Sequence, residues 1–256
     1  MMKDETRKMG VDVIGNIPWG THICLFYQTA EDLIDILVPY FKTGLENNEF
    51  CMWVTSEPLN VEDAKRALKR EIKELDEYVE RGQIEFLDYR QWYTESGRFE
   101  ADRVLQGWVE KEQQAMKRGW DGLRLTGNTF WLEKEDWRAL ADYEAMVDHV
   151  IGEYRMIAIC TYFLDKCGAP EIVDVVSNHQ FALIRRGGEW EVITSARRRR
   201  QSRCCGQARR AIATYSRIHP SRYLNKTFLL PGSGSRPCAA RGSQTSGLSS
   251  RNIQKW

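Results

Sequence analysis

The sequence predicts an α/β domain with a mostly parallel central sheet flanked by helices and a C-terminal β-hairpin. Short apolar segments rich in β-branched and aromatic residues alternate with longer segments of helical period, which is typical of βα units. Residues 50–55 (FCMWVT) are apolar on both faces of the expected strand, as in a strand that helices cover on both sides. Towards residue 190, two β-rich runs flank Gly187 and Gly188, a pair that favours a hairpin turn.

The elements follow one another in a regular order. The first expected strand, residues 22–27, precedes a helix that Thr29 can cap and whose apolar side chains recur every four residues from Leu33 to Leu45. Pro39 lies inside this helix and predicts a kink or a helix start. We expect further strands at 50–55, 84–89, 122–126 and 156–164, helices at 58–75, 101–116, 136–151 and 170–178, a loop at 90–99, and hairpin strands at 180–184 and 190–193.

Charge divides the chain at residue 197. All 36 Asp and Glu residues precede it, whereas residues 197–256 hold 14 of the 37 basic residues and no acid. The first 196 residues therefore carry 23 basic against 36 acidic side chains, a net charge of −13. We predict a folded acidic domain at 1–196 and a basic, disordered tail at 197–256.

The sequence lacks the characteristic features of several function classes. No apolar run reaches the roughly 18 residues of a membrane helix, and the N-terminus lacks a signal peptide, so we expect a cytoplasmic protein. The chain contains no G-x-x-x-x-G-K-[ST], no G-x-S-x-G, no H-E-x-x-H and no C-x-x-C. His149 and Glu153 are four residues apart, but two ligands do not make a metal site. We therefore predict no enzymatic activity, no cofactor and no metal site.

The expected strand ends suggest a ligand site. In an open parallel sheet, ligands bind outside the carboxyl ends of the strands. The sequence places aromatic and polar residues at these ends, a combination typical of small-molecule pockets, although strand ends also meet polar loops for ordinary reasons. The ligand-binding residues predicted from this position are Tyr27, Thr55, Glu57, Asn128, Trp131 and Tyr162.

Glu144 is a further candidate because it falls within the apolar stripe of its helix. A carboxylate in that position needs a partner. The partner is either a buried arginine such as Arg124 or a bound ligand.

Two strands carry the remaining candidates. His22 shares a strand face with Cys24, and Cys160 shares one with Tyr162, so these side chains converge if both strands are central. His22 lies at the entering end of its strand, which instead favours a structural hydrogen bond. We include His22 and Cys160 among the predicted ligand-binding residues.

Five segments together resemble one known family. They are IPWGTHICLFYQTAEDLIDILVPYFKTGLENNEFCMWVTSEP, GLRLTGNTFWL, DYEAMVDHVI, MIAICTYFL and SNHQFALIRRGGEWEVI. In type, spacing and order these segments are similar to the MEDS family, the methanogen/methylotroph sensory domain of a dichloromethane-responsive regulator. The resemblance covers residues 10–193.

The resemblance implies a sensory input domain with a RecA-like fold that lacks the P-loop. Such domains are joined to histidine kinase or DNA-binding output modules in archaeal or bacterial two-component signalling, and simple hydrocarbon derivatives are their expected ligands. We therefore expect a small organic ligand and a kinase or transcriptional partner, no membrane, and nucleic acid only through the basic tail. The residues that match family positions are His22, Cys24, Tyr27, Gly127, Trp131, Glu144, Cys160, Tyr162 and His179.

The resemblance ends after Ile193, where no recognisable output module follows. The tail is then a basic arm for an acidic partner, an unusual linker, or the product of a shifted reading frame. For the domain itself, we expect a small-molecule-sensing input module; the alternative is a divergent RecA-like nucleotide-binding protein.

Overall fold

The computed structural model describes residues 5–132 and 136–194. Within them, seven strands form one sheet in the order β5-β4-β6-β7-β3-β8-β9. Neighbouring strands from β5 to β8 are parallel, and β9 runs antiparallel to β8, so the predicted parallel sheet and C-terminal hairpin are confirmed. The strands are β3 (Thr21–Tyr27), β4 (Phe50–Thr55), β5 (Ile84–Asp88), β6 (Leu123–Asn128), β7 (Met156–Phe163), β8 (Phe181–Arg186) and β9 (Glu189–Thr194).

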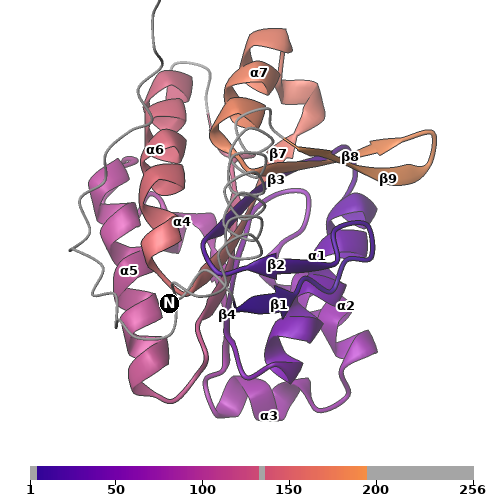
Figure 1. Ribbon diagram of the computed structural model, residues 1–256, viewed down its shortest axis with the longest axis vertical. Coiled ribbons are helices and arrows are strands. Elements are labelled where there is room, and N and C mark those ends of the chain that lie inside the picture. Colours follow the sequence, from indigo (N-terminus) through magenta and orange to yellow (C-terminus); the bar gives the residue numbers. More distant parts are fainter. Residues whose placement is uncertain (1–4, 133–135, 195–256) are drawn as a thin grey trace, which may run out of the picture. The chain divides into compact units, whose positions relative to one another are not determined.

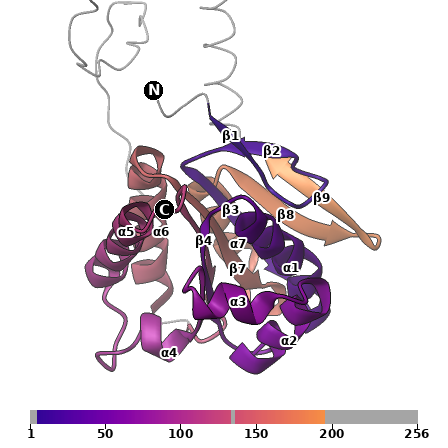
Figure 2. The ribbon, with the colours of Figure 1, turned by 90° about the horizontal axis from the view of Figure 1, so that it is seen from below.

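Helices cover both faces of the sheet (Figures 1 and 2). On one face lie α1 (Ala30–Glu46), α2 (Val61–Glu71) and α3 (Leu75–Glu80). Residues of α4 (Tyr89–Trp92), α5 (Ala101–Lys117), α6 (Trp137–Val150) and α7 (Ala169–Asn178) pack on the other, with short 3₁₀ turns at Ile151–Glu153 and Leu164–Lys166. Two buried apolar clusters result, one on each face, and the strands between them read as nearly continuous apolar runs.

Local capping by Thr29 and Asp32 determines where helix α1 begins. Thr29 accepts a hydrogen bond from the backbone N–H of Asp32, whose carboxylate accepts one from the backbone N–H of Thr29. This reciprocal capping satisfies N–H groups that a helix start leaves free, so α1 begins at Ala30 and continues through Pro39 to Glu46. The expectation of a helix start at Pro39 is therefore wrong.

Two local predictions need correction, and one hairpin was not predicted. The helix expected at 58–75 is α2 and ends at Glu71, because Ile72 takes an extended conformation; α3, which starts at Leu75, was not predicted. The expected loop at 90–99 begins with α4, which Asp88 caps together with Gln91. A two-stranded antiparallel hairpin near the N-terminus, β1 (Thr6–Lys8) and β2 (Asn16–Pro18), was not predicted, since three-residue strands carry no readable alternation.

A buried ion pair joins this hairpin to the sheet. Arg124 and Glu49 are both fully buried and form a charge-assisted hydrogen bond. Arg124 also donates from Nη1 to the carbonyl oxygen of Met9 at 2.9 Å and from Nη2 to that of Lys8 at 2.8 Å. The proposed pairing of Arg124 with Glu144 is therefore wrong, because β6 presents Arg124 to the helical face opposite to α6.

Asp32 ties the start of α1 to the C-terminal hairpin. Its carboxylate accepts from the backbone N–H groups of Gln28 and Thr29, and Arg185 donates to it from Nη1 at 2.8 Å. Burial alone would raise the pKa of Asp32, but the Arg185 guanidinium and the two N–H groups hold this pKa below its usual value.

We expect Asp32→Asn to make the free energy of unfolding less dependent on pH in the acidic range. A carboxyl with a lowered folded-state pKa contributes stability above its unfolded pKa of about 3.9, and that contribution is lost as the pH falls through the folded value. In urea titrations, the variant should be less stable by roughly 1 kcal/mol at pH 7. The two proteins should converge as the pH approaches 2. A difference that stays constant down to that pH would contradict this account.

None of the helices in the described ranges combines the length and apolar character needed to cross a membrane. The predicted basic tail at 197–256, and the boundary at residue 196, lie outside these ranges.

Candidate functional site

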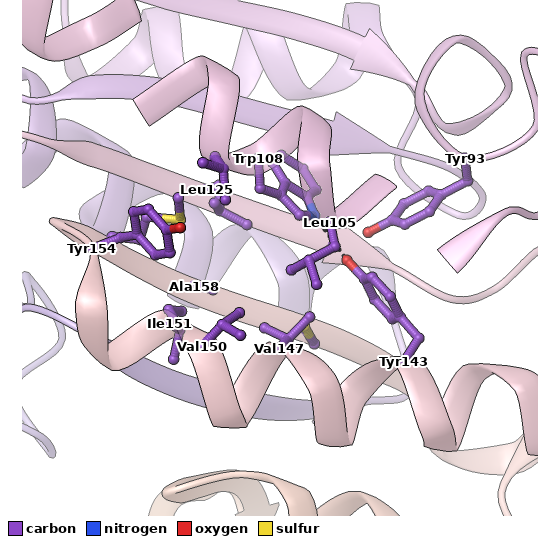
Figure 3. A pocket seen from close by; sticks show the side chains of 14 residues that line it. Tyr93, Leu105, Trp108, Leu125, Tyr143, Val147, Val150, Ile151, Tyr154 and Ala158 are labelled. Atoms are coloured by element: carbon purple, nitrogen blue, oxygen red, sulfur yellow. Dashed lines mark hydrogen bonds between the residues drawn. The ribbon is translucent and has the colours of Figure 1, made fainter. Parts of the chain in front are cut away.

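An enclosed apolar pocket lies between α5, α6 and the sheet (Figure 3). Leu125 and Ala158, from the central strands β6 and β7, form its floor, while Trp108 and Val147 come from the two helices. Figure 3 shows Tyr93 and Tyr143 at one end of the pocket and Tyr154 at the other. The site therefore lies between the helical layer and the sheet, and its Tyr93 end reaches the carboxyl end of β6 at Gly127.

Few polar groups face this pocket, and some are already paired. Trp108 donates from Nε1 to the hydroxyl of Tyr143 at 2.7 Å, which links α5 to α6. A Cβ atom at Gly127 would lie 2.6 Å from the hydroxyl oxygen of Tyr93 and 3.6 Å from Sγ of Cys160. Gly127 therefore lets a tyrosine hydroxyl reach the strand beside the Cys160 thiol.

The free space in the pocket is small. The cavity volume is about 20 Å³. This is room for about one water molecule or a compound with very few heavy atoms. Larger guests would have to push α5 and α6 away from the sheet.

Cys160, which lines the pocket, also belongs to a group of four side chains that we call the buried cluster: His22, Glu144, Cys160 and His179. They come respectively from β3, from α6, from β7 and from the C-terminal cap of α7. The exposed fraction of each is 7% or less. One nitrogen, oxygen or sulfur atom from each lies within 4.8 Å of all the others.

The contacts within the buried cluster are short. Nε2 of His22 lies 3.3 Å from Sγ of Cys160 and 3.2 Å from Oε2 of Glu144. Nε2 of His179 lies 3.5 Å from the same carboxylate oxygen. The two imidazole rings are 3.9 Å apart between centroids, so they pack against one another.

Burial controls the protonation of the cluster. Burial and the neighbouring His22 lower the pKa of His179 to about 3, so its ring is neutral at pH 7. Burial would raise the pKa of Glu144, but His22 beside it, together with a hydrogen bond from Tyr162, holds this pKa below its usual value. Burial, reinforced by Glu144, raises the pKa of the Cys160 thiol well above its usual range. The cluster thus holds a carboxylate and a neutral imidazole in contact.

The predicted site residues fall into two groups. His22, Glu144 and Cys160 meet in the buried cluster, and the Tyr162 ring lies edge-on to His179 at 5.8 Å between centroids. Cys24 lies on the same face of the sheet as the buried cluster, but its thiol donates to the carbonyl oxygen of Phe181 at 3.5 Å.

The second group lies at the carboxyl ends of the strands. Asn128 accepts from the Ser56 hydroxyl at 2.5 Å, and Trp131 donates from Nε1 to the carbonyl oxygen of Asn128 at 2.6 Å. Tyr27 is buried against Phe163, Thr55 donates to the carbonyl oxygen of Leu87, and Glu57 is exposed. Of the predicted site residues, Cys160 alone is among those that line the apolar pocket.

Sequence reasoning missed most of the pocket lining. Trp108, Tyr143 and Val147 read as the ordinary apolar stripes of amphipathic helices, since core and pocket residues share one periodicity. The signal that was present is Gly127 beside Asn128, because a glycine inside a strand indicates a close approach of another group.

The strand order, the helices on both faces and the antiparallel edge hairpin define a RecA-like α/β domain. Residues 21–180 match the MEDS family, described as the methanogen/methylotroph, DcmR sensory domain, and the chain belongs to this family. The suspected family is thereby confirmed.

Two solved structures are similar to this chain. A KaiC-like protein from Pyrococcus horikoshii OT3 is 18% identical, with a TM-score of 0.47 over 73% of this chain and 85% of that one. The flagellar accessory protein FlaH from Methanocaldococcus jannaschii is 13% identical, with a TM-score of 0.43 over 74% of this chain and 83% of that one. Among curated proteins, none matches.

Proposed function

We propose that this domain is a cytoplasmic small-molecule sensor whose apolar pocket takes a compound of one or two carbon atoms, such as a simple halogenated or hydroxylated hydrocarbon. The observation that carries the proposal is the pocket itself. It is enclosed by aromatic and aliphatic side chains and has free space for only a few heavy atoms. A sensing role agrees with membership of a family of sensory domains.

Two helices give the pocket a means of reporting its occupancy. Trp108 on α5 and Val147 on α6 both line it, so a guest changes how these helices pack on β6 and β7. A ligand that fits one arrangement better shifts the population towards it. We propose that a kinase or transcriptional output module reads this shift, and that the ligand leaves chemically unchanged.

The proposal is tested by narrowing the pocket. Ala158→Val adds two methyl groups to the pocket floor, and we expect it to abolish the rise in melting temperature that dichloromethane or methanol produces in the unchanged protein. Overpacking should lower stability by about 1–3 kcal/mol without preventing folding. Ala145→Val makes the same chemical change on an exposed position of α6 and should leave the response intact.

Widening the pocket gives the complementary test. Val147→Ala removes two methyl groups from the α6 wall, so three- and four-carbon compounds should gain affinity relative to one-carbon compounds. Gas chromatography of the recovered compound checks that no turnover occurs. If neither variant alters the response to any compound of this class, or if ATP alone raises the melting temperature, the pocket is not the sensory site.

A further inference from the structure

The buried cluster contains a ring nitrogen that no hydrogen bond satisfies. Nδ1 of His179 lies 2.7 Å from the carbonyl oxygen of Val175, which can only accept, so Nδ1 carries the proton. Nε2 of the same ring lies 3.5 Å from Oε2 of Glu144 and has no hydrogen-bond partner. The Glu144 carboxylate already has hydrogen-bond partners in His22 and Tyr162. Nε2 of His179 is therefore a buried ring nitrogen without a hydrogen bond, which is costly.

His22 lies between two other members of the cluster. Its Nε2 lies almost equally far from Sγ of Cys160 and Oε2 of Glu144, and a single N–H donates well to one of them only. In the described parts of the chain, the ion pairs of Glu144 involve only these two histidines. The buried arginine of this domain, Arg124, is occupied by Glu49 on the opposite face.

We propose that His22, Glu144, Cys160 and His179 bind one divalent transition-metal ion, with Zn²⁺ the best match. Two imidazole nitrogens, one sulfur and one carboxylate oxygen form a donor set that suits Zn²⁺ and excludes Ca²⁺ and Mg²⁺, which take oxygen ligands. This inference goes beyond the proposed function and does not depend on it. It also revises the sequence-based prediction of no metal site.

The distances fit this assignment. Metal bonds of about 2.0–2.3 Å in a tetrahedron place neighbouring ligand atoms about 3.3–3.8 Å apart. Contacts of 3.2, 3.3 and 3.5 Å join three pairs of atoms in the cluster, and all four ligand atoms lie within 4.8 Å of one another. On binding, the Cys160 thiol becomes a thiolate and releases its proton to solvent.

The surroundings also fit. A metal-binding histidine usually donates its second ring N–H to a carbonyl or carboxylate, as His179 does to Val175. The cluster joins β3, α6, β7 and the end of α7, so a metal ion there would cross-link elements from distant parts of the sequence.

The test is metal uptake by the full chain with Co²⁺ as a spectroscopic probe. Cys204, Cys205 and Cys238 could bind Co²⁺ themselves, so the background protein carries Ser at these three positions. After removal of metal with a chelator, we expect one Co²⁺ per chain, tetrahedral visible absorption and a thiolate-to-cobalt charge-transfer band. Addition of Zn²⁺ should abolish these bands.

Three variants decide the assignment. Cys160→Ser should abolish the charge-transfer band, and His179→Gln should weaken Co²⁺ binding by roughly tenfold or more. Cys24→Ser is the matched control: Cys24 is a buried thiol directly opposite Cys160 in the β3–β7 register, and a serine hydroxyl can still donate to Phe181, so the band should persist. Circular dichroism checks that each variant folds.

The proposal is overturned if the folded background protein takes up no Co²⁺, or if Cys160→Ser leaves the spectrum unchanged. In the first case, the four side chains share protons instead of a metal. Because the pocket is tested by Ala158→Val with organic compounds, failure of one proposal is distinguishable from failure of the other.

Discussion

Arg124→Met should lower the free energy of unfolding by about 3–5 kcal/mol. The substitution keeps most of the side-chain volume but leaves Glu49 buried with Arg7 as its remaining cationic partner. It also removes the donors to the carbonyl groups of Lys8, Met9 and Tyr40. Urea unfolding followed by circular dichroism measures the loss.

A second substitution tests how much of the loss comes from the Glu49 carboxylate, which keeps only Arg7 as an ion-pair partner. Glu49→Gln in the Arg124→Met background removes this carboxylate and should recover part of the lost stability, so the two effects are non-additive. Arg66→Met is the control, because Arg66 forms an exposed pair with Asp63 one helical turn away and should change stability by no more than about 0.5 kcal/mol. Equal losses for Arg124→Met and Arg66→Met would contradict the account.

Trp53→Ala should lower stability by a similar amount, about 3–5 kcal/mol. Trp53 is 1% exposed and stacks on Phe41 with ring centroids 4.7 Å apart and on Phe86 at 5.8 Å. Removing the indole leaves a cavity between the sheet and α1 that rigid neighbours fill only in part. Thermal and urea unfolding measure the loss.

The position of Trp53 makes this variant informative about function. It packs on the α1 face, whereas the apolar pocket and the buried cluster lie on the α6 face. At a temperature where the variant is folded, its affinity for a small organic ligand should therefore equal that of the unchanged protein. The milder Trp53→Phe, which keeps an aromatic ring, should show the same separation. A large change in ligand affinity would indicate that the two faces of the sheet are coupled.

The strands of the sheet were predictable because they are buried on both faces. Residues 50–55 and 156–163 contain almost only apolar side chains, a pattern that few other elements of this length produce. Strand order was not predictable in the same way. Strands β3 and β7 are neighbours, although some 130 residues separate them, and no local pattern in the sequence states this adjacency.

The candidate site was predictable only in part, for the same reason. The side-chain alternation of β3 and β7 placed His22 and Cys160 on faces that meet if the strands are central, and they do meet. His179 follows α7 at a position where a capping role is the ordinary explanation, so the stacking of its ring on His22 could not be predicted from the sequence. The pairing of Glu144 with histidines depends on where α6 lies, which tertiary packing decides.

The contacts of Arg124 with the N-terminal hairpin also set the minimum length of the autonomous folding unit. The family segment begins at residue 21, yet Met9, Ile17 and Trp19 are buried in the α1-side core, and Arg124 uses the carbonyl groups of residues 8 and 9. A polypeptide trimmed to the family segment would lose those acceptors and uncover that part of the core. The segment that matches the family is therefore shorter than the segment that supplies the hydrogen-bond acceptors of the buried Arg124 guanidinium.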